Sequence, residues 1–215
     1  MSGRFSFYYL PEVLQQELPE LSTDFVARWN ISPRQQVTLL RQTGGVRQTA
    51  QALWGFTPRW SKDMSHVATH ARAETVLQQD FFAPALASQR GVLLANGFFE
   101  WRGPAGTRKQ PYWLSREDEP LYMAALWEPY PVAGHEYLSV AMLTVAAAYL
   151  RRPLLLTRAD LDDWLNPATD PARITGLLQG NMLTLRERKV STLVNDPQSE
   201  GPECIRPVQA ARSLR

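Results

Sequence analysis

Cysteine and histidine are nearly missing from this chain, which has one cysteine and three histidines among its 215 residues. A single cysteine, Cys204, excludes an internal disulfide and any metal cage built from cysteines, and three histidines argue against a structural zinc site. We therefore expect no metal ion and no cofactor, and we expect Cys204 to be a small core residue.

Long apolar runs are also missing. No run approaches the roughly 18 residues that a membrane-spanning helix needs, and residues 1–5 lack the apolar region of a signal peptide. These absences predict a cytoplasmic protein without a membrane partner. With 44% hydrophobic residues the chain can bury a core of its own. We therefore expect one monomeric domain over residues 1–215, of which roughly the last 8 form a flexible tail.

Lysine is the third scarce residue, because 20 of the 23 basic side chains are arginine. Residues 41–110 carry nine basic and four acidic side chains, whereas residues 111–150 carry one and five, so one basic face is expected. Arginine binds phosphate with two donors and stacks on bases, and seven tryptophans add stacking surface. Nucleic acid is therefore a candidate partner, although solvated arginine faces are also common in ordinary enzymes.

What is present centres on residues 92–101, an apolar, strand-like run with one carboxylate, Glu100, among aromatic residues. Burial disfavours the charged form of a carboxylate unless a cation or a hydrogen-bond donor compensates it. A proton-handling glutamate near Gly97, which lets another chain come close, is typical of a reactive site. The alternative is a glutamate on the outer face of an edge strand with Arg102 nearby, and the segment alone favours neither.

Short apolar segments separated by turn residues predict strands along most of the chain. Helices are predicted at residues 11–21, at residues 157–165, opened by a capping-box pair of Thr157 and Asp160, and from Asp170 onward. Strands are predicted at residues 37–41 and 46–56, which form a hairpin, at 92–101, at 111–114 and 121–127, which flank an acidic turn, and at 137–145, 151–156 and 190–195; residues 29–33 are expected to be a loop. The sum is an α+β fold with a mainly antiparallel, barrel-like sheet and peripheral helices.

Two further segments carry chemistry. Residues 54–60 interleave aromatic residues with Gly, Pro and Arg, so Trp60 either offers a base a stacking platform or caps the core. His70, Arg72 and Glu74 alternate, which on a strand would place all three on one face. Such a row suits an anion, or it is a structural ion pair.

Short blocks along the chain resemble one family in their order and spacing. They are Gly3-Arg4-Phe5, Asn30 and Pro33, Trp54-Gly55 with Pro58 and Trp60, residues 71–75, residues 97–101, residues 109–112, Arg152-Pro153, and Val190-Ser191 with Val194-Asn195. Together they resemble the SOS-response-associated peptidases, or SRAP domains, which recognise abasic sites in single-stranded DNA. The resemblance spans nearly the whole chain and implies a positively charged groove that leads to the N-terminal residue. It implies DNA-binding roles for Arg4, Asn30, Pro33, Trp60, Arg72, Trp101, Arg151 and Arg152.

The resemblance also implies four catalytic positions, of which only Glu100 matches. The family's nucleophile is a cysteine directly after the initiator methionine, where this chain has Ser2. The family's asparagine falls on His70 and its histidine on Tyr149. The family joins the aminothiol to the abasic aldehyde as a stable thiazolidine, whereas Ser2 would form an imine or a readily hydrolysed oxazolidine, and only after Met1 is removed. We expect Ser2, His70, Glu100 and Tyr149 to meet in one pocket.

Three interpretations stay open at this point. The chain binds single-stranded or abasic DNA but has lost or weakened covalent capture. Alternatively, it is a retooled hydrolase in which His70 activates Ser2 with help from Glu100, which would need His70 within about 3 Å of the Ser2 hydroxyl. In the third interpretation it is a noncatalytic scaffold or partner-binding module.

Overall fold

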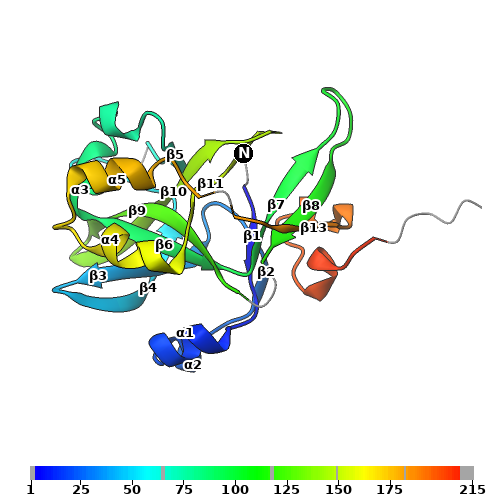
Figure 1. Ribbon diagram of the computed structural model, residues 1–215, viewed down its shortest axis with the longest axis horizontal. Helices are drawn as coiled ribbons and strands as arrows, with labels where there is room; N and C mark the ends of the chain where they lie inside the picture. Colours follow the sequence, from blue (N-terminus) through cyan, green and yellow to red (C-terminus); the bar gives the residue numbers. More distant parts are fainter. Residues whose placement is uncertain (1–2, 64–65, 117–118, 149, 182, 209–215) are drawn as a thin grey trace, which may run out of the picture.

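The computed structural model describes residues 3–63, 66–116, 119–148, 150–181 and 183–208. Within these residues the strands form one sheet of eight strands and one of five (Figure 1). The strands are β1 (Phe5–Phe7), β2 (Arg28–Ile31), β3 (Gln36–Thr43), β4 (Val46–Trp54), β5 (His70–Arg72), β6 (Arg90–Ala95), β7 (Gly97–Arg102), β8 (Gln110–Ser115), β9 (Leu121–Val132), β10 (His135–Ala146), β11 (Arg151–Pro153), β12 (Leu155–Leu156) and β13 (Arg186–Lys189).

Part of the larger sheet closes into a barrel. Its order is β11-β10-β4-β3-β6-β9-β12, and β5 lies beside β10. Because β9 also pairs with β10, the strands β10, β4, β3, β6 and β9 form a ring. Only β4 and β5 run parallel to their neighbour β10, so the sheet is mainly antiparallel. Every residue of β6 is buried, as expected for a strand that crosses the core. The predicted α+β fold with a barrel-like sheet is confirmed.

The hairpin of β3 and β4 follows the prediction closely. Gly44 and Gly45 connect the two strands with φ angles of 58° and 82°. A two-residue hairpin turn with both φ angles positive matches the right-handed twist of the strands, and glycine adopts it without steric cost.

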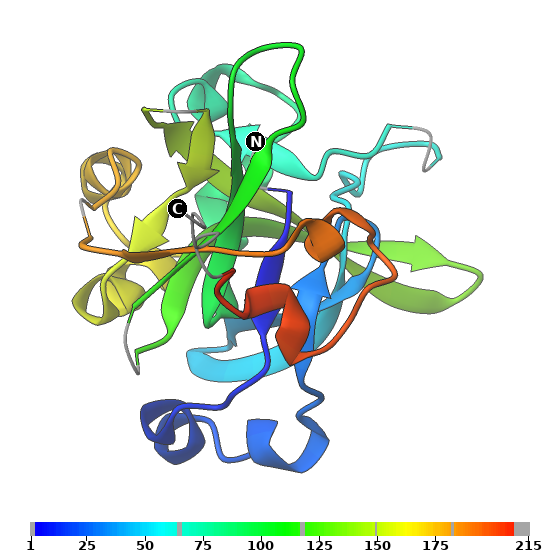
Figure 2. The same cartoon turned by 90° about the vertical axis from the view of Figure 1, so that its right-hand side faces the viewer.

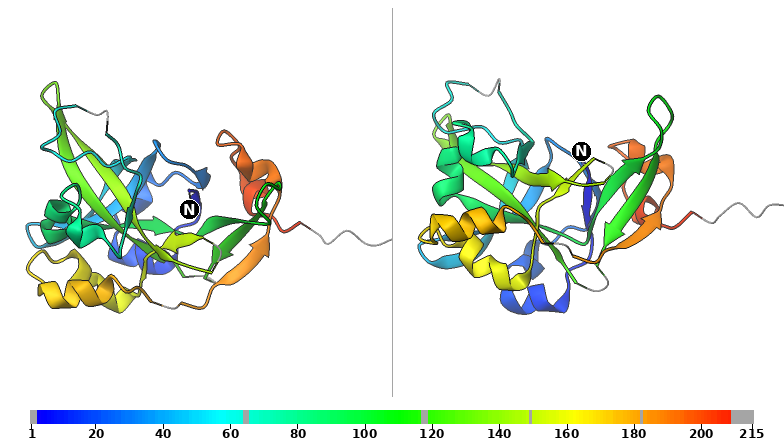
Figure 3. Two further views of the ribbon diagram at one scale, coloured as in Figure 1. Left: turned by 90° about the horizontal axis from the view of Figure 1, so that it is seen from above. Right: turned by 45° about the horizontal axis from the view of Figure 1, so that its top comes forward.

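The smaller sheet has the order β13-β8-β7-β1-β2, and all its strands are antiparallel. Figures 2 and 3 show β1, in dark blue, between the barrel and the hairpin of β7 and β8, whose loop projects from the rest of the molecule. The strand β1 therefore belongs to the smaller sheet and also contacts the barrel, at β6.

The run 92–101 is not one strand as predicted. It turns at Asn96 and continues from β6 of the barrel into β7 of the smaller sheet. The Asn96 side chain fixes this corner, because its Oδ1 accepts hydrogen bonds from the backbone N–H groups of Tyr8 (2.8 Å) and Tyr9 (3.0 Å). The corner moves Glu100 out of the barrel and beside β1.

Gly97 follows the corner, and its lack of a side chain allows the strands β7 and β8 to pack closely there. A Cβ atom at this position would lie 2.5 Å from the Trp113 ring and 2.6 Å from the carbonyl oxygen of Leu114. Any larger residue would push β8 away from β7. The close approach expected at Gly97 is confirmed.

The helices are short, and α3 and α4 pack against β6 of the barrel. They are α1 (Glu12–Glu17), α2 (Leu21–Asp24), α3 (Ala83–Ser88), α4 (Leu161–Leu165) and α5 (Pro171–Leu177), with 3-10 turns η1 (Val76–Gln78), η2 (Arg158–Asp160), η3 (Thr192–Asn195) and η4 (Pro202–Ile205). The capping box of Thr157 and Asp160 is confirmed, and Asp170 caps α5 by accepting from the N–H of Ala172. The single helix predicted over 11–21 is wrong, since α1 ends before Pro19 and α2 begins after it.

The strands β8 and β9, on either side of the acidic turn, belong to different sheets. Two other expectations were wrong. Residues 28–31 form strand β2 rather than a loop, and residues 192–195 form η3 rather than a strand. The strand in that region is β13, an entirely exposed Arg-Glu-Arg-Lys segment without the apolar alternation that predicts strands.

Among the described residues no helix is both long and apolar enough to cross a membrane. The expected C-terminal tail falls almost entirely on residues 209–215, outside the described part of the chain.

Candidate functional site

Glu100 lies in the middle of β7 and is only 8% exposed. Arg102 donates to its Oε2 from Nε (3.1 Å) and Nη2 (2.8 Å). Arg152, from the barrel strand β11, donates to Oε1 from Nε (2.5 Å) and to Oε2 from Nη2 (3.3 Å). The carboxylate is therefore compensated by two arginines from different sheets. The alternative of an outer edge strand is wrong, because β7 lies between β8 and β1.

Glu187 on β13 completes a neutral group that we call the glutamate–arginine cluster: Glu100, Arg102, Arg152 and Glu187. Its carboxylate accepts two hydrogen bonds from Arg102, at 2.6 and 2.7 Å, and lies 3.6 Å from Arg152. The hydrogen bonds that Arg102 donates to Glu187 and Glu100 raise the pKa of Arg102. The bonds from Arg102 also lower the pKa of Glu187. Sequence reasoning missed Glu187, because nothing in an exposed charged segment indicates that it faces Glu100.

The start of β1 runs directly beside Glu100. Phe5 pairs with Phe98, and the N–H of Phe99 donates to the Arg4 carbonyl at 3.0 Å. In an antiparallel pair this register places Gly3 opposite Glu100. Ser2 and Tyr149, two of the four predicted catalytic residues, lie outside the described residues. Their proximity to Glu100 stays a prediction. The described residue next to Ser2 is Gly3, which lies opposite Glu100.

His70 begins β5 on the barrel side and is half-buried. Its Nδ1 lies 2.9 Å from the Thr69 hydroxyl, and its ring meets Trp54 edge-on at 5.4 Å between centroids. The Trp54 ring in turn lies 5.3 Å from that of Phe5 in β1. His70 is therefore two ring contacts away from the strand that runs beside Glu100.

The predicted polar row does not form on one strand face. Glu74 lies in the turn after β5, where it accepts from Arg151 at 2.5 Å and from the N–H of Ala146 at 2.9 Å. Arg151 also donates to the hydroxyl and the carbonyl oxygen of Thr144. The structural ion pair weighed as the alternative is therefore present for Glu74, while Arg72 remains exposed on β5.

Arg4 and Asn30 tie β1 and β2 to the loop around η3. Arg4 donates to Asn30 Oδ1 (3.0 Å) and to the Val194 carbonyl (2.7 Å), and it lies 6.0 Å from the Trp101 ring. Asn30 is fully buried and donates to the carbonyl oxygens of Val194, Asp196 and Ser199. The buried amide orients this loop, and the DNA-binding role expected for Asn30 stays a prediction.

Trp101 and Trp60 offer aromatic surface in different ways. Trp101 is half-buried and donates from Nε1 to Asn195 Oδ1 at 2.7 Å. Trp60 is 60% exposed and touches only the edge of Phe81 among the described rings. Pro33 is half-buried in the turn before β3. Trp60 is therefore available to stack, whereas Trp101 is oriented by Asn195, a partner that the sequence did not suggest.

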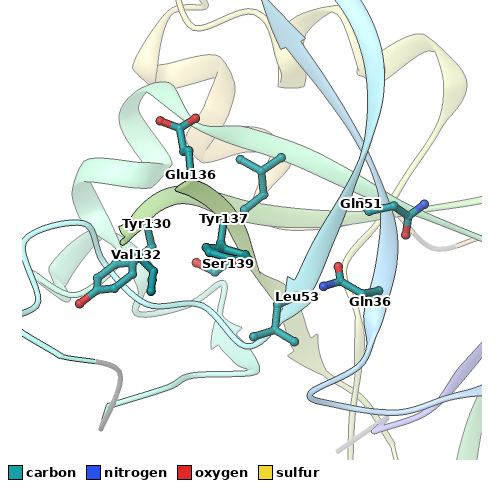
Figure 4. A pocket seen from close by; sticks show the side chains of 9 residues that line it. Gln36, Gln51, Leu53, Tyr130, Val132, Glu136, Tyr137 and Ser139 are labelled. Atoms are coloured by element: carbon teal, nitrogen blue, oxygen red, sulfur yellow. The ribbon is translucent and has the colours of Figure 1, made fainter. Parts of the chain in front are cut away.

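A cavity of about 550 Å³ lies away from these residues, between the β3–β4 and β9–β10 hairpins (Figure 4). Tyr130, Val132 and Tyr137 form much of its wall, and Glu136 points from its rim. None of the predicted site residues lines this cavity. We therefore do not assign the candidate chemistry to it.

Cys204 is fully buried in η4, which confirms its predicted place in the core, and burial raises the pKa of its thiol. Among the described residues, no group of three or more His, Cys, Asp and Glu side chains could hold a metal ion.

Comparison with known proteins agrees with the sequence blocks. Residues 1–197 match the family described as SOS response associated peptidase (SRAP). The abasic site processing protein YoqW of Bacillus subtilis is 29% identical over 95% of this chain and 99% of its own length. The abasic site processing protein YedK of Escherichia coli is 26% identical over 97% of this chain and 100% of its own length.

The fold has counterparts among solved structures. A protein from Bacteroides thetaiotaomicron superposes with a TM-score of 0.79 at 18% identity, over 95% of this chain and 100% of its own. At that identity the likeness concerns the fold alone.

Proposed function

The chain belongs to the SOS response associated peptidase (SRAP) family, and from that premise we propose that it binds single-stranded DNA, including strands with an abasic site. Relatives that carry the name abasic site processing protein, and that align over nearly their whole length, support a DNA partner. The exposed Arg72 and Trp60 support a strand held by phosphate contacts and base stacking.

We further propose that covalent capture is weakened. The observation that carries this proposal is that Ser2 stands where the family has its nucleophilic cysteine. The register of β1 and β7 places the neighbouring Gly3 opposite Glu100. The α-amine of Ser2, once Met1 is removed, would add to the ring-opened abasic aldehyde and lose water to give an imine. The serine hydroxyl closes only an unstable ring, whereas a thiol would close a stable one.

A cross-linking assay tests this function. Wild-type protein, with loss of Met1 verified by mass spectrometry, is incubated with abasic single-stranded DNA, with and without borohydride. We expect a complex that survives heating only after borohydride reduction of the imine. Ser2→Cys should give a slow, heat-resistant cross-link without borohydride, and adding His70→Asn and Tyr149→His should accelerate it. A wild-type cross-link as stable as that of the triple variant would contradict the proposal.

The matched strand without an abasic site is the control, because it lacks the aldehyde but keeps the phosphates. It should bind without any trapped product. Hydrolase chemistry by Ser2 and His70 stays an open alternative, because Ser2 lies outside the described residues.

A further inference from the structure

We propose that Arg152 is a displaceable cap on Glu100, and that a backbone phosphate of the bound single strand takes its guanidinium away from the carboxylate. The inference rests on the proposed function, since it needs a strand bound beside Glu100. The inference adds that DNA binding changes the site: Oε1 of Glu100 becomes accessible only when a phosphate binds Arg152.

The Arg152 contact joins two sheets and is the more exposed of the two that Glu100 makes. Arg152 comes from β11 of the barrel, and 30% of its side chain is exposed, against 12% for Arg102. Its Nε donates to Oε1 at 2.5 Å, while its other bond to Glu100 is 3.3 Å and its distance to Glu187 is 3.6 Å. A ligand in solvent can therefore reach Arg152 without unpacking the sheet.

Arg102 holds the carboxylate independently of Arg152. It binds Oε2 through two donors, is fixed by two bonds to Glu187, and lies 4.7 Å from the Tyr112 ring. If Arg152 leaves, Glu100 keeps a charged partner and only Oε1 is released. A buried charge without a partner would be costly, but this exchange creates none.

Phosphate is the ligand that suits this exchange. A guanidinium binds phosphate through two parallel hydrogen bonds, as it binds a carboxylate. Each phosphodiester brings one negative charge, so Arg152 exchanges one anionic partner for another. The neighbouring Arg151 is already bound to Glu74 and Thr144. Of Arg151 and Arg152, Arg152 is therefore the one that can exchange its partner with the smaller loss of fold stability.

The freed oxygen lies where the proposed chemistry would use it. The register of β1 and β7 places Gly3 opposite Glu100, so Oε1 would become available next to the start of the chain. A carboxylate oxygen there can accept a proton from an attacking amine. Without DNA the same oxygen is covered by Arg152.

Side-chain NMR tests the exchange directly. The Nε–H resonances of Arg152 and Arg102 are assigned with Arg152→Lys and Arg102→Lys, and the wild-type protein is titrated with a short oligothymidine strand. We expect the Arg152 resonance to shift at saturation while that of Arg102 stays in place. A strand with an uncharged methylphosphonate backbone is the control and should leave Arg152 unchanged.

An unchanged Arg152 resonance, with the oligothymidine strand fully bound by fluorescence anisotropy, would overturn the inference and leave the proposed function intact. Absence of any binding of the strand in the same titration would overturn the proposed function itself, and the inference with it.

Kinetics separate a displaceable cap from a merely structural arginine. With free deoxyribose, an aldehyde without phosphate, Arg152→Met should form the borohydride-trapped product about tenfold faster than wild type, because Oε1 is uncovered. Arg152→Lys should restore the slow rate. With saturating abasic DNA, wild type and Arg152→Met should react at similar rates. Equal rates of wild type and Arg152→Met with deoxyribose would contradict the inference.

Discussion

The Arg102 guanidinium lies between two carboxylates, with its Nη2 2.8 Å from Oε2 of Glu100 and 2.6 Å from Oε1 of Glu187. This contact links the centre of the smaller sheet to its edge strand β13. It also keeps a negative charge tolerable where Glu100 is buried.

Arg102→Ala should therefore destabilise the fold strongly. Removing one partner of a buried ion pair costs about 3–5 kcal/mol, because the remaining charges lose their compensation. Urea unfolding measures the change. Arg116→Ala is the matched control, since Arg116 pairs with Glu119 at the surface and such pairs contribute about 0–1 kcal/mol. Equal losses in the two variants would show that the cluster is not a buried network.

Stability should fall as pH rises from about 4.3 to about 7 because of Glu128. This carboxyl is 3% exposed, and burial raises its pKa to about 7, an effect that Arg59 opposes. The folded state thus holds a proton that the unfolded state releases above about pH 4.3. The stabilisation is complete below that pH and is lost between about pH 4.3 and 7, up to about 3 kcal/mol.

Glu128→Gln keeps the shape of the side chain and removes the titration. Urea unfolding between pH 5 and about 8 should give a flatter pH profile for this variant than for wild type. Parallel profiles would rule out Glu128 as the source of the slope.

Trp60→Ala should weaken DNA binding while leaving the fold intact. The ring is 60% exposed and meets the ring of Phe81 edge-on, so little packing is lost. Stacking of a base on an aromatic ring contributes about 1–3 kcal/mol, which predicts a loss of about 5- to 150-fold in affinity for a single strand. Tyr137→Ala is the control, because this exposed tyrosine lines the separate cavity. A similar loss from both variants would argue against a specific platform at Trp60.

Arg72→Ala should lower the salt dependence of binding. Each phosphate contact to a single strand contributes about 0.7 to the slope of log affinity against log salt concentration, so the slope should fall by about that amount. Arg173→Ala, on α5, removes an exposed arginine paired with Asp160 and Asp163 and should leave the slope unchanged. An unchanged slope for Arg72→Ala would exclude a phosphate contact there.

Local patterns predicted the parts of the fold that depend on neighbours in sequence. The Gly44-Gly45 hairpin, the capping box at Thr157 and the close approach at Gly97 each follow from one or two residues. The sequence did not predict the corner at Asn96, because the partners that fix it, Tyr8 and Tyr9, lie about 90 residues away.

Glu100 could be singled out from the sequence, but its surroundings could not. An isolated carboxylate in an apolar run is compatible with burial or with an outer strand face, and its compensation by Arg152 depends on how two sheets meet. Charged residues also carry no pattern that separates structural from binding roles. The sequence does not distinguish Arg4, Arg72 and Arg151. In the structure, Arg4 and Arg151 donate hydrogen bonds to other residues of the protein, whereas Arg72 is exposed.

Fluorescence anisotropy of labelled single strands tests the central claim most directly. Strands with and without one abasic site, and the matched duplex, are titrated with wild-type protein at low and at physiological salt. Both single strands should bind more tightly than the duplex, with affinity that falls steeply as salt rises. No binding of single strands at low salt, or an affinity that is the same at both salt concentrations, would contradict it.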